Sequence, residues 1–253
     1  IDLTGFCEHG RTDILAFRPA PVQVNYLGFP GSTGADFVDY IIADSTIIPE
    51  DRARYFSEKV VYLPDSYQAN DRKRRVGPRV PSRREAGLPD EGTVFCAFNN
   101  AYKITPPIFD LWMKLLREVD GSVLWLLGDN PGAIRNLALA AEARGVPARR
   151  LVFAHRVAPD EHLARFGLAD LFLDTLPYNA HTTASDALWA CVPVITCMGE
   201  AFAGRVAASL LKAVGLPELI TGSLEDYEAQ ALKLGGDQEG LKELKETKAE
   251  LAR

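Results

Sequence analysis

The sequence predicts an α/β fold built on a doubly wound parallel sheet. From Thr93 onward, short apolar runs alternate with amphipathic stretches long enough to form helices. Repeating units of this kind are typical of strands joined by crossover helices, with helices on both faces of the sheet. No short-period repeat is visible within the chain. The second part of the chain is therefore expected to form one such sheet.

The composition is that of an ordinary globular protein. The 253 residues are 47% hydrophobic and 25% charged, enough for one large domain or one and a half. The net charge is −6 and the pI about 5.3, without the basic stripe that nucleic acid demands. No apolar run approaches the roughly 20 residues of a membrane span, and no signal peptide opens the chain. We expect neither nucleic acid nor a membrane as a partner.

The cysteines indicate a reducing, cytoplasmic setting. The four cysteines include no CxxC pair, so the sequence shows no disulfide framework. Cys96 and Cys191 stand in apolar surroundings and are predicted to be core thiols.

The first 64 residues predict a smaller unit. Its expected elements are a short helix at 49–58 and strands at 22–27, 37–42 and 59–63. The glycine-rich loop 28–34 is either a flexible connector or a backbone that lets a ligand come close. It fits neither phosphate-loop pattern.

A polar, turn-rich segment at 65–81 separates the two parts. It carries the basic cluster Asp71–Arg75, for which we favour the usual interpretation, a solvated loop. We place a domain boundary here. Residues 1–80 are then the end of one lobe with its linker, and residues 81–253 form a second lobe.

The second part alternates regularly. Strands are expected at 93–98, 122–127, 150–153, 170–174 and 193–196, and helices at 108–119, 134–143, 159–166, 184–190, 201–214, 224–234 and 239–252. In a doubly wound sheet, ligands bind at the carboxyl ends of the strands. The loops after the first four strands are therefore expected to share one crevice.

The stretch 171–194 is the most informative of these units. An apolar strand is followed by a polar loop that includes His181, and then by a helix that Thr182 and Thr183 introduce. Two hydroxyls, unpaired backbone N–H groups and the helix dipole form a good cradle for a phosphate group. Asp186, one turn into the helix, is placed to accept hydrogen bonds from a ribose. The alternative is an ordinary helix start that one of the threonines caps.

Two further loops at the same sheet edge carry polar side chains. After the strand 93–98, Lys103 offers a charge to a diphosphate and Asn100 offers two amide donors. Considered alone, this loop favours a solvated lysine at Lys103. The loop 155–162 offers His162 as a stacking surface, and the alternative there is a capped helix start with an exposed histidine. No loop has a cluster with metal-ligand spacing. Together these loops favour a phosphate-bearing nucleotide bound without a metal.

Several stretches resemble, in order, the catalytic region of protein O-linked N-acetylglucosamine transferases, and the bacterial members more than the animal enzyme. They are Ala16–Gln23, Leu27–Gly34, Phe98–Lys103, Ser122–Leu127, His181–Asp186, Gly199–Glu200 and Arg205–Ser209. The resemblance covers nearly the whole chain. It implies a GT-B type glycosyltransferase with two Rossmann-like lobes, the first one incomplete here. UDP-N-acetylglucosamine would be the donor, held mainly by the second lobe, with no cofactor and no metal.

The resemblance also implies roles around the diphosphate and the ribose. Lys103 matches the lysine on the diphosphate, and Asn100 stands where the family often has a glutamine that contacts UDP. Asp186 matches the carboxylate on the ribose. The residues around the phosphates are matched by His181, Thr182 and Thr183.

Other matched positions surround the base and the sugar. His162 matches the histidine that stacks near uracil, and Arg165 a neighbouring contact. Ala158 matches a further uracil contact, in a loop that is shorter here than in the animal enzyme. Leu27 and Gly28 match positions beside the sugar.

The resemblance implies further sequence on both sides of the chain. The family's first lobe begins upstream and carries a histidine proposed as the catalytic base, often with tetratricopeptide repeats before it. Ile1–Thr4 looks like the end of a buried strand and no initiator Met precedes it, while a helix is expected after Arg253. His9 lies in no matching motif. We therefore expect a fragment without the base, with unpaired strand edges and exposed apolar faces around residues 1–64.

The function that follows is transfer of N-acetylglucosamine to Ser or Thr hydroxyls of proteins, inverting and metal-independent. The resemblance leaves open an O-fucosyltransferase of the same architecture. A UDP-sugar-binding domain without turnover is a second alternative, and a UDP-sugar epimerase or hydrolase on the same fold is a third.

Overall fold

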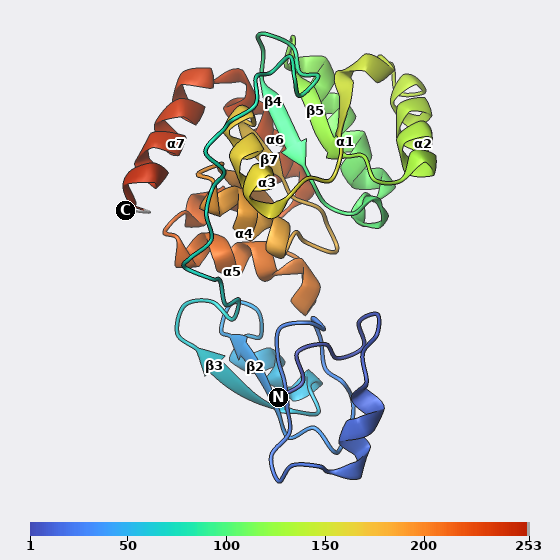
Figure 1. Cartoon of the computed structure of the whole chain (residues 1–253), viewed down its shortest axis with the longest axis vertical. Helices are drawn as coiled ribbons and strands as arrows, with labels where there is room; N and C mark the ends of the chain where they lie inside the picture. Colours follow the sequence, from blue (N-terminus) through green and yellow to red (C-terminus); the bar gives the residue numbers. More distant parts are fainter. Residues whose placement is uncertain (252–253) are drawn as a thin grey trace.

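The chain folds into two lobes, each built on a parallel β-sheet (Figure 1). The computed structural model describes residues 1–251, with side chains for residues 1–246. The first sheet has the order β1-β2-β3 and the second the order β6-β5-β4-β7-β8-β9, and neighbouring strands are parallel throughout. The strands are β1 (Val24–Asn25), β2 (Tyr40–Asp44), β3 (Lys59–Leu63), β4 (Val94–Ala97), β5 (Val123–Leu127), β6 (Leu151–Ala154), β7 (Leu171–Leu173), β8 (Val194–Cys197) and β9 (Ile220–Thr221).

Helices cover both faces of the second sheet, which confirms the doubly wound arrangement. One face packs against α3 (Pro159–Arg165), α4 (Thr182–Trp189) and α5 (Val206–Ala213). The other face packs against α1 (Pro106–Glu118), α2 (Pro131–Glu142), α6 (Leu224–Gly236) and α7 (Gln238–Leu251).

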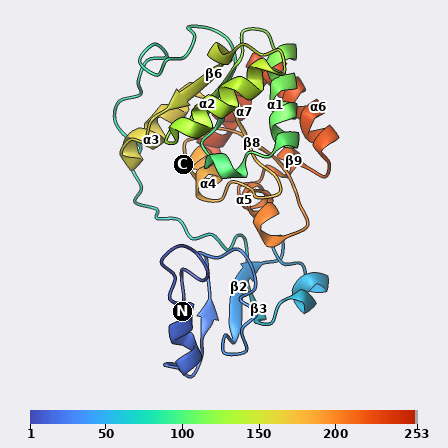
Figure 2. The ribbon, with the colours of Figure 1, turned by 90° about the vertical axis from the view of Figure 1, so that its right-hand side faces the viewer.

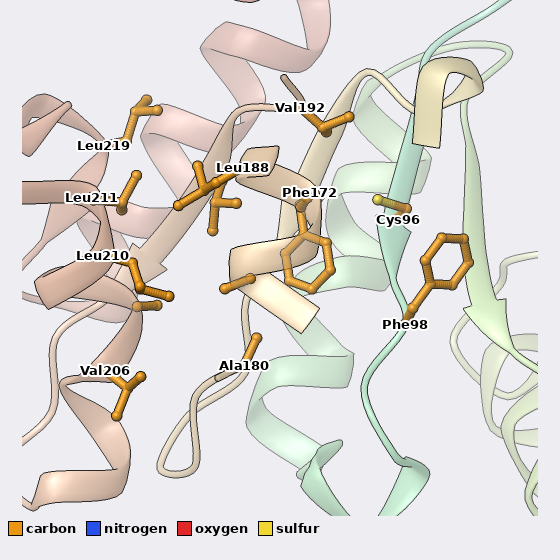
Figure 3. Packing of buried hydrophobic residues seen from close by; sticks show 14 of the residues in the cluster. Cys96, Phe98, Phe172, Ala180, Leu188, Val192, Val206, Leu210, Leu211 and Leu219 are labelled. Carbon is orange, nitrogen blue, oxygen red and sulfur yellow. The ribbon is translucent and has the colours of Figure 1, made fainter. Parts of the chain in front are cut away.

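Strand β4 shows why the second sheet is buried on both sides. Cys96 and Phe98 belong to the buried cluster on the α4–α5 face, whereas Phe95 and Ala97 belong to the cluster on the opposite face. Side chains alternate across a strand, so an apolar run without interruption fills two cores at once. Figure 3 shows part of the first cluster, in which Phe172 of β7 lies between the side chains of β4 and those of α4 and α5.

The first lobe is smaller and less well covered. Its strand β3 follows the predicted range, but Val61 and Tyr62 keep 41% and 39% of their surface exposed. The helix expected at 49–58 is a 3-10 helix at Glu50–Tyr55, and a second one at Thr12–Phe17 was not predicted. Exposed apolar side chains are therefore concentrated in this lobe, as the sequence led us to expect.

A buried contact joins the two lobes. Ile41, Ile47 and Tyr67 of the first part belong to the same apolar cluster as Val206 and Leu210 of α5. Residues 64–93 contain no helix or strand, and in Figure 2 this linker runs along one side of the second lobe, past α3. The predicted boundary at residue 80 falls within it.

Local details differ from the expectations. Cys96 is buried, but the prediction of Cys191 as a core thiol is wrong: Cys191 is partly exposed and lies in a turn after α4 with φ of 60°. Short β9 was missed, and the helix expected at 201–214 is a 3-10 turn at Phe202–Gly204 followed by α5. The last expected helix, 239–252, corresponds to α7, and residue 252 lies outside the described residues. None of the helices described within residues 1–251 is both long and apolar enough to cross a membrane.

Candidate active site

The candidate site lies where the strand order of the second sheet reverses. From β4 the order continues through β5 and β6 to one side, and from β7 through β8 and β9 to the other. The loops that leave β4 and β7 therefore diverge and open a crevice at the carboxyl edge of the sheet. A cleft of about 560 Å³ occupies this crevice.

The cleft brings together most of the residues predicted for the site. Those that line it are Leu27, Gly28, Asn100, Lys103, His181, Thr182 and Thr183. They come from both lobes and from two loops at the reversal point. The shared crevice that the sequence predicted is thus present. Ala158, His162, Arg165 and Asp186 do not line it.

Helix α4 begins at the cleft without a side-chain cap. The prediction that Thr182 or Thr183 caps the helix is wrong, because both are helical residues and the N-cap residue is His181, whose side chain makes no capping bond. The Thr183 hydroxyl instead donates to Asn99 Oδ1 at 2.6 Å. The first N–H groups of α4 thus have no capping side chain. They and the helix dipole favour an anion at this point.

Lys103 supplies a positive charge beside this helix start. It ends a short 3-10 turn after β4, and its Nζ donates to the Asn179 carbonyl oxygen at 2.8 Å. The same Nζ lies 4.0 Å from the centre of the Tyr178 ring. Burial lowers the pKa of Lys103 to about 8, against the opposing charge of Asp174. The ammonium group is therefore desolvated and still mainly charged at pH 7.

Asp174 holds the loop between β7 and α4 in shape. Its Oδ1 accepts the backbone N–H groups of Thr175 (2.7 Å) and Ala180 (2.6 Å), and its Oδ2 accepts the Thr196 hydroxyl (2.6 Å). Burial raises the pKa of this carboxyl to about 7, and the three hydrogen bonds oppose that shift. Both ends of the turn that carries His181 are thus tied to one buried group.

His181 is neutral and fixed. Its Nε2 lies 3.2 Å from the carbonyl oxygen of Ala203, and because a carbonyl only accepts, Nε2 carries the proton. Burial lowers the pKa of His181 to about 4, and the nearby charge of Lys103 adds to the effect. The imidazole therefore acts as a hydrogen-bonding surface at neutral pH and not as a second cation.

Asp186, His162 and Arg165 form a connected group behind the helix start. The Asp186 carboxylate pairs with the Arg74 guanidinium and lies 3.9 Å from His162 Nε2. Burial lowers the pKa of His162 to about 4, with help from Arg165, Arg74 and Arg156. Arg165 donates to the carbonyl oxygen of His155 at 2.6 Å and lies over the Phe98 ring at 4.7 Å. Ion pairing, hydrogen bonding and ring contacts thus connect α3, α4 and the linker on the α3–α4 side of the cleft.

Ala158 stands apart from this group. It is exposed and is the residue immediately before α3. No side-chain hydrogen bond caps that helix, so backbone groups at its start stay available to a neighbouring ligand.

The glycine-rich loop of the first lobe is closely packed and hydrogen-bonded beside the cleft. Leu27 has φ of 71°, and a Cβ on Gly28 would lie 2.2 Å from the carbonyl oxygen of Leu3, so only glycine fits there. The buried Glu58 carboxylate accepts the Ser32 hydroxyl and the Thr33 N–H, both at 2.6 Å. Leu27 and Gly28 of this loop line the cleft, in keeping with the interpretation of a backbone that lets a ligand come close.

A sequence profile decides the family. The profile of glycosyl transferase family 41 matches residues 1–78 and 73–253. The chain belongs to glycosyl transferase family 41.

Relatives of this family 41 chain carry consistent names. It is 41% identical over 240 residues, 92% of its length, to the probable UDP-N-acetylglucosamine–peptide N-acetylglucosaminyltransferase SEC of Arabidopsis thaliana. It is 28% identical over 352 residues to the UDP-N-acetylglucosamine–peptide N-acetylglucosaminyltransferase of Caenorhabditis elegans, which covers 95% of the chain. Among solved structures, a mutant O-GlcNAc transferase of Thermobaculum terrenum matches 100% of the chain with a TM-score of 0.89 and 33% identity.

These matches confirm the family resemblance and the GT-B type fold that the motifs predicted. The family 41 chain spans 25% and 31% of the two curated relatives and 48% of the solved transferase.

Sequence reasoning missed several residues that line the cleft. They are Tyr67, Gln68, Ala69, Asn70, Phe98, Asn99, Leu127, Arg156 and Tyr178. Asn99 and Tyr178 lie inside loops that the sequence had singled out, so the position after a strand was signal enough. Residues 67–70 belong to the linker, and no local pattern placed them at the cleft.

Among the side chains of residues 1–246, no three His, Cys, Asp or Glu groups lie together in a way that could hold a metal ion. Among the residues that line the cleft, Lys103 and Arg156 carry positive charge.

Proposed function

We propose that the full-length protein transfers N-acetylglucosamine from UDP-N-acetylglucosamine to Ser or Thr hydroxyls of proteins. The observation that carries the proposal is the uncapped start of α4 beside Lys103, at the reversal point of a family 41 fold. This arrangement suits a diphosphate, because helix N–H groups and a desolvated ammonium both favour negative charge. The names of the relatives support the donor sugar and the protein acceptor.

Each predicted residue has a place in the proposed donor complex. The diphosphate lies between Lys103 and the start of α4, where His181, Thr182 and Thr183 surround it, and Asn100 offers its amide from the facing loop. Leu27 and Gly28 bound the sugar end of the cleft. The ribose lies towards Asp186 and the base towards α3, on the side of the cleft where Asp186, His162, Arg165 and Ala158 stand behind the lining residues.

The proposed mechanism is a single inverting displacement. The acceptor oxygen forms a bond to the anomeric carbon while the bond to the diphosphate oxygen breaks. Negative charge grows on the departing UDP, which Lys103 and the α4 dipole stabilise. The proton of the acceptor hydroxyl passes to a base that is not assigned among the residues of this chain. We propose that no metal ion takes part, since fixed positive groups already lie beside the diphosphate position.

The setting of the protein belongs to the same proposal. Free thiols at all four cysteines are compatible with a bacterial cytoplasm. We propose tetratricopeptide repeats upstream, on the family resemblance, and acceptor proteins rather than nucleic acid or membrane as partners, in keeping with the net charge of −6.

The test is transfer of labelled sugar by the full-length protein. Incubation with UDP-N-acetylglucosamine and cell protein should yield modified Ser or Thr residues in mass spectrometry. Lys103→Ala should weaken UDP binding or turnover by about 1.5–3 kcal/mol, as expected for a charge-assisted contact. Transfer of fucose in a parallel reaction supplied with a fucosyl nucleotide, without transfer from UDP-N-acetylglucosamine, would support the first alternative. UDP binding without any transfer would support a non-catalytic domain.

Metal independence has its own test. Activity of the full-length protein should survive chelation with EDTA. A rate that falls on chelation and returns with Mn²⁺ would contradict this part of the proposal.

A further inference from the structure

The linker between the lobes is fastened to the helices that form the candidate site. Three contacts hold it: the Ser185 hydroxyl donates to Asn70 Oδ1 at 2.7 Å, the Gly77 N–H donates to the Asp160 carbonyl oxygen at 2.9 Å, and Arg74 pairs with Asp186. The first and third reach α4, and the second reaches α3. Residues 67–70 also line the cleft, so the linker is part of the wall of the site and not only a connection.

Arg74 is the member of the basic cluster that departs from a solvated loop. Its neighbours Lys73 and Arg75 are exposed, but the Arg74 side chain is only 22% exposed and its guanidinium lies 5.9 Å from the Trp189 ring. The predicted solvated loop is thus wrong at this one residue. The partner that draws Arg74 inward, Asp186, is 112 residues away in the sequence.

The ion pair with Arg74 opposes the effect of burial on the Asp186 carboxyl. The Asp186 side chain is only 10% exposed, and burial raises the pKa of this carboxyl, whereas the contact with Arg74 opposes the rise. The other titratable side chain that faces it is His162 of α3, which is neutral at pH 7 because its pKa is lowered to about 4. Arg74 is therefore the charged group that favours the ionised form of Asp186.

We propose that Arg74 is a positioning residue for the donor nucleotide, which holds the Asp186 carboxylate ionised and aimed so that it accepts hydrogen bonds from the ribose hydroxyls. The inference rests on the proposed function, since it takes UDP as the ligand of the cleft. An ionised carboxylate accepts at both oxygens, whereas a protonated one donates at one of them and loses acceptor capacity. Loss of Arg74 thus weakens ribose recognition without removing a group that touches the ribose.

The experiment compares two nucleotides on the full-length protein by calorimetry between pH 5 and 8. The ligands are UDP and 2′,3′-dideoxy-UDP, which lacks the ribose hydroxyls but keeps base and diphosphate. Arg74→Ala should weaken UDP binding about tenfold at pH 7 and leave the affinity for the dideoxy nucleotide unchanged. Arg75→Ala is the matched control and should change neither.

The pH profile separates positioning from a structural role. Without Arg74 the pKa of Asp186 rises, so UDP affinity should begin to fall at a higher pH as the solution is acidified. Arg74→Lys restores a cation, so the pH at which UDP affinity begins to fall should return towards the wild-type value. Asp186→Asn should remove the difference between the two nucleotides, and adding Arg74→Ala to it should cause no further loss.

Several results would overturn the proposal. Equal weakening of both nucleotides by Arg74→Ala would show a general structural defect, and an unshifted acid limb would show that Arg74 does not act through Asp186. If the wild-type protein binds UDP and Arg74→Ala binds it with the same affinity, Arg74 has no role in donor binding. The proposed donor site itself would not be contradicted. Absence of UDP binding by the wild-type protein would remove the proposed function together with this inference.

Discussion

The two lobes use the same parallel β architecture but bury it to different degrees. In the second lobe Leu124 of β5 is fully buried, with helices on both sides of the sheet. In the first lobe Val61 of β3 keeps 41% of its surface exposed, and the buried Ile41 and Ile47 pack into a cluster that continues into α5. The second lobe thus has a core of its own, whereas the first lobe depends on its neighbour for part of its core.

The largest expected effect tests this contrast directly. Leu124→Ala should lower the free energy of unfolding by about 2–5 kcal/mol, because it leaves a cavity in a closed core. Val61→Ala on the exposed strand should cost less than about 0.5 kcal/mol. Denaturant unfolding of both variants measures the difference. Equal losses would mean that the first lobe is covered as completely as the second.

The next effect concerns the turn that carries the anion site. Asp174→Ala removes the carboxylate that accepts hydrogen bonds from three donors and should cost about 2–4 kcal/mol of stability. Asp174→Asn keeps an oxygen for the two backbone N–H groups and should cost less. Chemical unfolding of these variants beside the exposed Asp120→Ala is the measurement. If Asp174→Ala lowers the free energy of unfolding no more than Asp120→Ala does, the loop between β7 and α4 keeps its conformation without the Asp174 hydrogen bonds.

A pH titration of UDP affinity tests whether the positive charge at the donor site is the Lys103 ammonium group of the second lobe. The pKa of Lys103 is lowered to about 8, so its ammonium is present at pH 7 and lost as the pH rises through that value. UDP affinity should therefore fall about tenfold between pH 7 and 9. Lys103→Arg keeps its charge over this range and should not show the alkaline loss. Persistence of that loss in Lys103→Arg would point to another titrating group.

The smallest effects compare two contacts between the lobes. The Ser209 hydroxyl donates to the buried Asp44 carboxylate at 2.6 Å, so Ser209→Ala should cost about 1 kcal/mol. Glu200 pairs with Arg52 at the rim and is largely exposed, so Glu200→Ala should leave the thermal midpoint unchanged. Thermal unfolding of both variants ranks the contacts, and a larger shift for Glu200→Ala would contradict the ranking.

Much of the fold followed from local patterns, because strands buried on both faces give apolar runs that are hard to mistake. The strand at 59–63 was predicted to the residue. The boundaries of α4 were less accurate, since Thr182 and Thr183 are plausible caps as well as helical residues, and only the backbone decides. Cys191 was misplaced for a similar reason: apolar neighbours in the sequence do not show that a residue turns outward at φ of 60°.

The candidate site could be predicted where its polar residues lie in a loop that follows the carboxyl end of a strand. Lys103 and His181 lie in the loops that follow β4 and β7, so the rule about carboxyl edges brings them together. Arg74 could not be found this way, because its position depends on a partner from a distant helix. A basic cluster looks the same in sequence whether all of its members are solvated or one is paired.

The reversal of strand order between β4 and β7 has a consequence for how much change the second lobe tolerates. All of the loops that shape the cleft leave the carboxyl ends of strands, while the turns at Gly121, Gly145 and Gly215 lead into the opposite ends of the sheet. Residues inserted at those turns should therefore leave the geometry of the cleft unchanged. Gly145 is exposed, and a Cβ added to it would meet no atom within 4 Å, so we expect this turn to accept an inserted tag or small domain while donor binding is preserved.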